Sequence, residues 1–156
     1  MAIKVLNIGK SKNTYLVQAV QDYLTRLGKY AIVQWIERPS VRKKQYKTAD
    51  ELKKLEADEI LAEVKPNTFL IGLDEKGKTF TSRDFAQQLN SWTRSNADIA
   101  FVIGGAFGFH DSVYQRMDTM ISLSKMTLSH QMVRLLLIEQ IYRGYSILNG
   151  EPYHND

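Results

Sequence analysis

The chain contains no cysteine among its 156 residues, and this absence removes three kinds of chemistry together. Disulfide bonds, thiolate metal sites and cysteine nucleophiles all need a thiol. A chain without cysteine also suits a reducing compartment, so we expect a cytoplasmic protein. The three histidines His110, His130 and His154 are too scattered for a local metal-binding spacing, and we expect no bound metal.

Long apolar runs are missing as well. No stretch approaches the roughly 20 apolar residues needed to cross a bilayer, and the N-terminal residues lack the charged-then-apolar pattern of a signal peptide. We therefore expect no membrane partner and no export by that route. The formal net charge is only +4. A charge of this size permits a phosphate-rich partner without requiring one.

Short apolar runs that are typical of buried strands alternate with segments of helical periodicity. The uninterrupted apolar run 99–103 predicts a central strand of a parallel sheet that is covered by helices on both faces. Nothing marks a domain boundary, so we predict a single α/β domain over 1–156, a parallel-sheet layer sandwich. The predicted strands are 3–8, 31–36, 68–73, 99–103 and 119–123, and the predicted helices are 13–27, 48–64, 82–92, 111–117 and 129–148.

Local signals define where several of these elements begin and end. Thr48 and Glu51 have the spacing of a capping box, and Ser82 and Ser129 are expected to cap the helices that follow them. The segment 74–78 is rich in turn-forming residues and predicts a turn after the third strand. The segment 38–47 is basic and polar and predicts an exposed loop.

The last predicted helix is apolar around its whole circumference. An amphipathic helix carries its apolar residues on one stripe, so this helix must bury more than one face. Its own sheet can cover one side, and a second copy of the chain could cover the other. The apolar residues are Met132, Val133, Leu135, Leu136, Leu137, Ile138 and Ile141.

Three familiar motifs are absent on close reading. The phosphate-loop pattern needs a glycine five residues before Gly9, where the chain has Lys4. The glycine-rich segment 104–108 has Ala106 where a dinucleotide fingerprint needs its second glycine, which argues against a nicotinamide cofactor. No serine occupies a Gly-x-Ser-x-Gly turn, so a serine hydrolase is disfavoured. The segment 104–108 still predicts a glycine turn that either faces a small ligand or packs tightly.

Polar residues in the last third allow two interpretations each. His130, at a helix start where the dipole disfavours a charged ring, is either a neutral hydrogen-bonding group or an exposed cap residue. Glu139 and Arg143, four residues apart, form either a solvated surface pair or part of a site. The tail 152–154 is either frayed or functional.

Taken together, the C-terminal motifs closely resemble the RlmH family of SPOUT-class methyltransferases. The resemblance extends over the whole chain, and one departure is Ser129, where family members commonly carry proline. That serine also supplies a helix cap. The motifs are Phe101-Val102-Ile103-Gly104-Gly105, Ser122-Leu123-Ser124-Lys125-Met126-Thr127, His130-Gln131-Met132-Val133-Arg134, Ile138-Glu139-Gln140-Ile141-Tyr142-Arg143 and Pro152-Tyr153-His154.

This resemblance implies a parallel α/β sheet with a C-terminal trefoil knot, a homodimer packed through that region, and S-adenosylmethionine as the methyl donor. Patterning alone could not indicate the knot, because knots are rare exceptions to normal chain topology. The resemblance implies donor contacts from Leu73, Gly104, Leu123, Ser124, Lys125, Met126, Thr127 and Leu128. The apolar members of this set could sandwich an adenine while loop amides and carbonyls read its edge.

The reaction that the resemblance implies is methylation of N3 of a pseudouridine in large-subunit (23S) ribosomal RNA, within assembled ribosomes. For it we expect His154 as a proton acceptor, Arg143 as a cation for the anionic ring, Tyr153 as a stacking or donor group, and Glu139 as the residue that fixes Arg143. Expected phosphate contacts are Lys10, Lys12, Arg38, Arg42, Lys43 and Lys44, although a basic segment can also be simply solvated.

Two alternatives stay open at this point. One is a SPOUT methyltransferase that acts on another ribosomal position or on transfer RNA. The other is a non-catalytic ribosome-binding or assembly protein that retains the fold and ignores S-adenosylmethionine.

Overall fold

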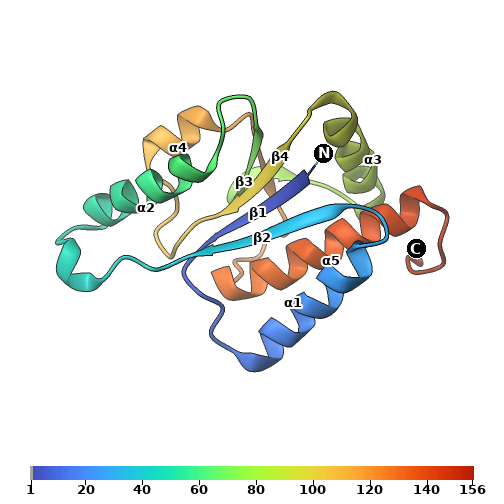
Figure 1. Cartoon of the computed structure of the whole chain (residues 1–156), viewed down its shortest axis with the longest axis horizontal. Coiled ribbons are helices and arrows are strands. Elements are labelled where there is room, and N and C mark those ends of the chain that lie inside the picture. Colours follow the sequence, from blue (N-terminus) through green and yellow to red (C-terminus); the bar gives the residue numbers. More distant parts are fainter. Residues whose placement is uncertain (1) are drawn as a thin grey trace.

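The protein is described by a computed structural model that covers residues 2–156. Its frame is a five-stranded sheet in which every neighbouring pair of strands is parallel. The order across the sheet is β2-β1-β4-β3-β5 (Figure 1). The strands are β1 (Ala2–Ile8), β2 (Ile32–Arg38), β3 (Phe69–Thr79), β4 (Ile99–Ile103) and β5 (Thr119–Ser122).

Helices cover both faces of this sheet, as the predicted layer sandwich requires (Figure 1). One face carries α1 (Thr14–Leu27), α3 (Ser82–Ser95) and α5 (His130–Leu148), and the other carries α2 (Ala49–Glu63) and α4 (Asp111–Arg116). A short 3₁₀ turn, η1 (Lys43–Gln45), precedes α2. No helix of residues 2–156 is both long enough and apolar enough to span a bilayer.

The central position predicted for the run 99–103 is confirmed by β4, which lies between β1 and β3. Successive strand side chains point to opposite faces. Accordingly, Ile99, Phe101 and Ile103 join the core under α1, α3 and α5. Ala100 and Val102 join the smaller core under α2 and α4. All five residues are buried, because both faces are covered.

The turn predicted at 74–78 is wrong, because β3 continues through it to Thr79. Its pairing with β5 shifts register between Leu73 and Lys78, so the turn-forming residues make an irregular bulge within the strand. Gly77 permits this arrangement. A Cβ there would lie 2.5 Å from the carbonyl carbon of Ile121, so only glycine allows the two strands to approach so closely.

Two of the three predicted helix caps are confirmed. The Thr48 hydroxyl accepts from the Glu51 amide at 3.1 Å, and the Ser129 hydroxyl accepts from the Met132 amide at 3.2 Å. The cap at Ser82 is wrong: Thr81 takes that place by accepting from the Asp84 amide. Ser82 is free for a different bond, described below.

The expected loop 38–47 is partly structured. Arg38 ends β2 and forms an ion pair with Glu63 at the end of α2, so it does not belong to the loop. Residues Lys43–Gln45 form the 3₁₀ turn, and most side chains of this segment are exposed, as predicted. The other predicted elements are confirmed with small differences at their ends; β5, for example, stops at Ser122.

Candidate active site

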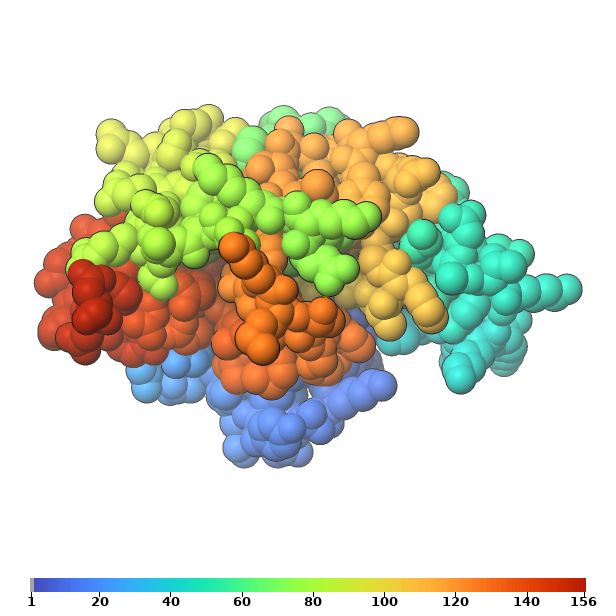
Figure 2. All heavy atoms as spheres, turned by 180° about the vertical axis from the view of Figure 1, so that it is seen from behind, coloured from blue at the N-terminus to red at the C-terminus, as the bar shows by residue number. Residues whose placement is uncertain are grey.

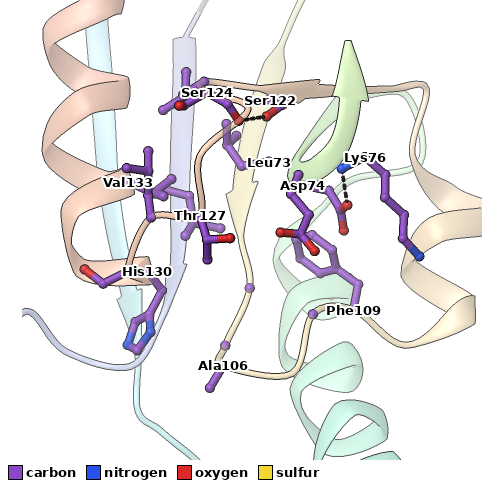
Figure 3. Close-up of a pocket in the computed structure, with 18 of the residues that line it drawn as sticks. Leu73, Asp74, Lys76, Ala106, Phe109, Ser122, Ser124, Thr127, His130 and Val133 are labelled. Carbon is purple, nitrogen blue, oxygen red and sulfur yellow. Dashed lines mark hydrogen bonds between the residues drawn. The ribbon is translucent and has the colours of Figure 1, made fainter. Parts of the chain in front are cut away.

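A pocket of about 560 Å³ opens beyond the carboxyl ends of β3, β4 and β5. Open parallel sheets bind ligands at this edge, and the volume lies in the range of small-molecule sites. Thr127 and His130 lie on one side of it, and Asp74 and Phe109 lie on the other (Figure 3). Of the donor contacts expected from the sequence, Leu73, Gly104, Leu123, Ser124, Met126, Thr127 and Leu128 line the pocket, and Lys125 does not.

The glycine turn after β4 forms the floor of the pocket. The Gly108 amide donates to the Gly105 carbonyl at 3.3 Å, and Gly108 has a φ of +79°, which favours glycine. A Cβ on Gly104 would lie 2.9 Å from the Phe109 ring. The turn therefore packs tightly, and it also lines the cavity.

The loop between β5 and α5 is held by its own serines. The Ser122 hydroxyl donates to the Ser124 carbonyl at 2.7 Å (Figure 3), and the Ser124 hydroxyl accepts from the Met126 amide at 2.9 Å. Such local side-chain bonds fix a loop that has no regular structure. The loop thus presents a formed edge to the pocket, while Met126 remains 77% exposed.

An acidic residue that sequence reasoning missed, Asp74, lies across the pocket from this loop. The Asp74 carboxylate accepts from the Tyr114 hydroxyl at 2.6 Å and from the Lys76 amide at 2.9 Å. Burial, followed by the bond to Asp74, raises the pKa of Tyr114 to about 12, so its hydroxyl stays protonated as a donor. An aspartate directly after a predicted strand was the available signal, but the segment was assigned to a turn.

His130 begins α5 at the rim of the pocket. Burial lowers its pKa, and the positive charges of Arg134 and Lys12 lower it further. A lowered pKa favours the neutral form of the ring, for causes other than the helix dipole.

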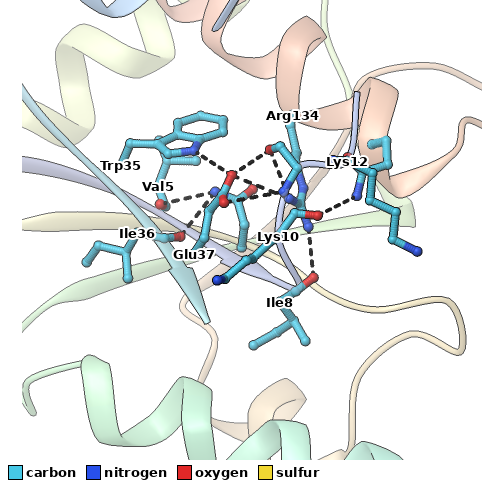
Figure 4. Close-up of polar contacts among 11 residues, drawn as sticks. Val5, Ile8, Lys10, Lys12, Trp35, Ile36, Glu37 and Arg134 are labelled. Atoms are coloured by element: carbon cyan, nitrogen blue, oxygen red, sulfur yellow. Dashed lines mark hydrogen bonds and ion pairs between the residues drawn. The ribbon is translucent and has the colours of Figure 1, made fainter. Parts of the chain in front are cut away.

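Arg134, also missed as a functional candidate, is completely buried one turn further along α5. Its guanidinium donates to the Ile8 carbonyl at 2.8 Å and to the Ser11 hydroxyl at 3.2 Å, and it lies 3.7 Å from the Glu37 carboxylate (Figure 4). Burial opposes ionisation of Glu37, but hydrogen bonds from Ser11 and Trp35 and the charge of Arg134 bring its pKa below the usual range. This network fixes the start of α5 against the ends of β1 and β2.

The residues expected to be catalytic form a second cluster. We call Glu139, Arg143, Tyr153 and His154 the tail cluster. Glu139 Oε1 accepts from Arg143 Nε at 3.1 Å, from Arg143 Nη2 at 2.5 Å and from the Tyr153 hydroxyl at 3.1 Å. The Arg143 guanidinium lies over the Tyr153 ring, 4.7 Å from its centre. The i,i+4 pair is therefore one part of a compact site, and the tail is packed against α5.

The hydrogen bonds of His154 determine its tautomer. Arg143 Nη1 lies 3.1 Å from Nδ1, and an arginine can only donate, so Nδ1 accepts. Nε2 then carries the proton and donates to Asp156 Oδ1 at 2.9 Å. Arg83 donates to both oxygens of Asp156 at 2.9 Å, which connects the tail to the start of α3.

The start of α3 also reaches the tail cluster from its other side. The Ser82 hydroxyl donates to Gln140 Oε1 at 2.8 Å, and Gln140 Nε2 donates to Glu139 Oε2 at the same distance. This is the bond that leaves Ser82 outside the helix cap.

The pocket and the tail cluster do not meet within one chain. None of the four cluster residues lines the pocket. In Figure 2 the tail (dark red) lies at one end of the molecule, and the loop around residue 126 (orange) lies near its middle. Within one chain, residues of 103–109 and 121–130 line the pocket together, and residues 151–154 lie apart from it.

The expected phosphate contacts differ in their surroundings. Lys10, Lys12, Arg42, Lys43 and Lys44 are exposed. Arg38 is already paired with Glu63. The backbone around Lys10 and Lys12 is fixed by Gln131 of α5, which accepts from the Lys12 amide and donates to the Lys10 carbonyl, each at 3.3 Å.

Comparison with solved structures defines the class of fold. The chain is similar to a probable methylase family protein from Haemophilus influenzae Rd KW20, with a TM-score of 0.59 and 15% sequence identity over 95% of this chain and 66% of that one. At this identity the likeness concerns the fold alone, which is that of an α/β methylase.

Sequence comparison gives the family. Residues 1–154 match the family model described as "Predicted SPOUT methyltransferase". The chain is also 45% identical, over 158 aligned residues and 99% of both sequences, to the ribosomal RNA large subunit methyltransferase H of Exiguobacterium sp. strain AT1b. The protein belongs to the SPOUT methyltransferase family, whose members use S-adenosylmethionine. The pocket fits this donor, because its lining combines apolar Leu73, Leu123 and Leu128 with the backbone of loops.

Proposed function

We propose that the protein methylates N3 of a pseudouridine in 23S ribosomal RNA. The full-length similarity to a ribosomal RNA large subunit methyltransferase carries the substrate class. The tail cluster supports the chemistry, because N3–H of this base lies between two carbonyls and becomes nucleophilic only as its proton leaves. A cation to stabilise the anionic ring and an acceptor for the proton are what such a site needs, and Arg143 and His154 lie side by side.

The donor, when bound, supplies a methyl group on a positively charged sulfur. Leu73, Leu123 and Leu128, with the loop backbone of the pocket, would hold the donor, which would supply its methyl group to the N3 lone pair. The protein's part is alignment and exclusion of water. The proton that leaves N3 goes to His154, and its charge is balanced by Asp156 at the opposite ring nitrogen.

The hydrogen bonds of the tail cluster suggest how substrate prepares this acceptor. At rest, His154 Nδ1 is occupied by Arg143 Nη1. A carbonyl of the incoming base takes over that donor, which frees the Nδ1 lone pair for the N3 proton. Glu139 keeps the remaining part of the guanidinium in place, because its carboxylate accepts hydrogen bonds from Nε and Nη2. The Tyr153 ring lies against the guanidinium, and the Tyr153 hydroxyl donates to Glu139.

The active enzyme, in this proposal, is a homodimer in which the tail cluster of one protomer completes the pocket of the other, and the C-terminal part of each chain is tied in a trefoil knot. Within one chain the pocket and the tail cluster lie apart, and this separation supports a site that two protomers share. Apolar groups left on the surface support the dimer: Phe107 and Met126 at the pocket are 60% and 77% exposed, and Met132 on α5 is 40% exposed.

The RNA partner is proposed to be the assembled ribosome, approached through Lys10, Lys12, Arg42, Lys43 and Lys44. Phosphate contacts make binding fall steeply with salt. We expect good methylation of intact ribosomal particles and poor methylation of a naked RNA fragment, measured as labelled methyl groups per particle. The reverse preference would contradict this part of the proposal.

Mixed dimers test the composite site. Thr127→Trp fills the pocket, and Arg143→Ala removes the cation of the tail cluster; each variant alone should be inactive. Random mixing gives about half heterodimers, and each of these holds one intact pocket facing one intact tail. We therefore expect about a quarter of the wild-type activity to return after mixing, with nucleoside mass spectrometry locating the methyl group. No recovery in verified heterodimers would contradict a shared site.

A further inference from the structure

Glu56 of α2 is a buried carboxylate that the reaction described above does not use. Its side chain is only 7% exposed. Its carboxylate takes part in none of the ion pairs formed by residues 2–156. Acidic side chains are rarely buried without a partner. The position of this one therefore calls for a physical reason.

The carboxylate lies directly against the glycine turn that forms the pocket floor. A Cβ on Gly105 would lie 2.6 Å and 2.9 Å from the two oxygens of Glu56. The space that a side chain would need at residue 105 is thus filled by the carboxylate. The Gly105 amide acts on this carboxylate as well, since it lowers the pKa of Glu56 against the effect of burial, while the Gly105 carbonyl accepts from the Gly108 amide.

The direction of that amide fixes the direction of the neighbouring carbonyl. In a trans peptide the N–H and the C=O point to opposite sides, and the structure has no cis peptide bond among its described residues. With the Gly105 N–H turned toward α2, the Gly104 carbonyl is turned away from α2. Gly104 lines the pocket, and Glu56 does not.

We propose that Glu56 is a positioning residue for the methyl donor: it holds the Gly105 N–H so that the Gly104 carbonyl stands ready to accept a hydrogen bond from S-adenosylmethionine. The role concerns the donor pocket alone. It depends on the family's use of S-adenosylmethionine and is independent of the nucleotide that is methylated or of the composite site.

The energetics of Glu56 agree with a functional role. Burial raises the pKa of Glu56, and the Gly105 hydrogen bond only partly opposes this shift. The ionised carboxylate therefore weakens the folded state at neutral pH. A group that lowers the stability of the folded state in this way is expected where it serves a functional site.

The test compares two substitutions at Glu56 with a control on the same helix. Glu56→Met keeps the shape and loses the acceptor, whereas the amide oxygen of Glu56→Gln can still accept from Gly105. Glu59→Met places the same change on the exposed side of α2. Calorimetry with S-adenosylmethionine should give a dissociation constant about tenfold weaker for Glu56→Met, which is the loss of roughly one hydrogen bond, and within about twofold of wild type for the other two.

Turnover provides a second readout that a loss of folding would not imitate. At saturating donor the kcat of Glu56→Met should stay within about twofold of wild type while the KM for the donor rises about tenfold. Unchanged donor affinity in a folded Glu56→Met protein would overturn the proposal. Equal weakening by Glu56→Gln or by the Glu59→Met control would overturn it too.

A Gly105→Ala variant keeps the proposal testable if Glu56→Met does not fold. Its Cβ displaces the carboxylate oxygens, so it should weaken donor binding in the wild-type background. In a Glu56→Ala background the Cβ has room, and the same change should add little. Equal increments in the two backgrounds would contradict the coupling between Glu56 and Gly105.

Discussion

The pocket and the tail cluster are built in opposite ways. The pocket is formed by glycines and loop backbone after three strands, and it is open, with exposed Phe107 and Met126 at its edge. The tail cluster consists of charged and aromatic side chains bonded to one another, and the side chains of Glu139 and Arg143 are only 15% and 23% exposed. The pocket offers space that is lined largely by backbone, and the tail cluster offers charged and aromatic side chains that are packed together.

This contrast explains why each site looks incomplete alone. Backbone groups can hold a methyl donor in one place, and they need no protonation change to do so. The proposed reaction also moves a proton from N3, which needs a side chain with a fixed tautomer, such as His154 between Arg143 and Asp156. The division predicts that the two functions can be removed separately by substitution.

The largest expected effect is that of Arg143→Ala on methylation. Removing the guanidinium withdraws the charge that stabilises the anionic ring in the proposed reaction, and it leaves Glu139 without its main partner. Single-turnover methylation of ribosomes should fall about 10³-fold or more. The calorimetric affinity for S-adenosylmethionine should stay within about twofold.

Arg143→Lys is the matched variant for this test. It keeps the positive charge, but a lysine side chain cannot donate to Glu139 from two nitrogens. We therefore expect little recovery of methylation. A lysine variant of normal activity would show that charge alone suffices. Loss of donor binding in Arg143→Ala would show that the two sites are not separable.

The second prediction concerns the support of the pocket. Arg134→Met removes a completely buried cation and leaves Glu37 with a weakened set of partners. Breaking such a pair should lower the free energy of unfolding by about 3 kcal/mol, measured by urea denaturation. Because Arg134 fixes the start of α5, at the pocket rim, donor affinity should fall as well.

A double variant sharpens this second test. Adding Glu37→Gln to Arg134→Met removes the uncompensated carboxylate, so part of the lost stability should return. Simple additivity of the two changes would contradict an energetic link between them.

The sequence predicted those elements whose signals are local. Apolar periodicity located the strands and helices, and the capping residues Thr48 and Ser129 act as expected. The spacing of Glu139 and Arg143 predicted their contact. Each of these features depends on residues within a few positions of one another, which is the range over which sequence patterns are informative.

The features that sequence reasoning missed depend on distant partners. Residues 74–78 have turn-forming chemistry, but pairing with β5 keeps them in β3, and Gly77 allows the close approach to Ile121. Arg134 and Glu56 are of residue types that are usually exposed; their burial follows from contacts with β1, β2 and the glycine turn. The distance between pocket and tail cluster is likewise a property of the folded chain.

The third prediction is a smaller effect within the tail cluster. Tyr153→Phe keeps the ring that lies under Arg143 and removes the hydroxyl that donates to Glu139 and pairs with Tyr23 at 3.0 Å. Turnover should fall about tenfold and stability by about 1 kcal/mol. Tyr15→Phe, at a tyrosine that is 69% exposed, is the control and should change neither. Weaker binding of the donor by Tyr153→Phe would contradict the separation of the pocket from the tail cluster.

The smallest effect is a pH dependence on the pocket side. The pKa of Glu37 is lowered in the folded protein because bonds from Ser11 and Trp35, with the charge of Arg134, outweigh burial. A lowered pKa means that Glu37 stabilises the fold above its unfolded pKa, and that this stabilisation is lost as pH falls through the folded pKa. The stability gap between wild type and Glu37→Gln should therefore be about 1 kcal/mol near neutral pH.

That gap should close as the pH falls toward about 3, as thermal unfolding scans at a series of pH values would measure. Glu59→Gln, at an exposed position of α2, provides the matched control and should show no such trend. A gap that stays constant down to acid pH would mean that the charge of Glu37 does not hold Arg134. The support of the pocket would then depend on the neutral bond from Arg134 to the Ile8 carbonyl.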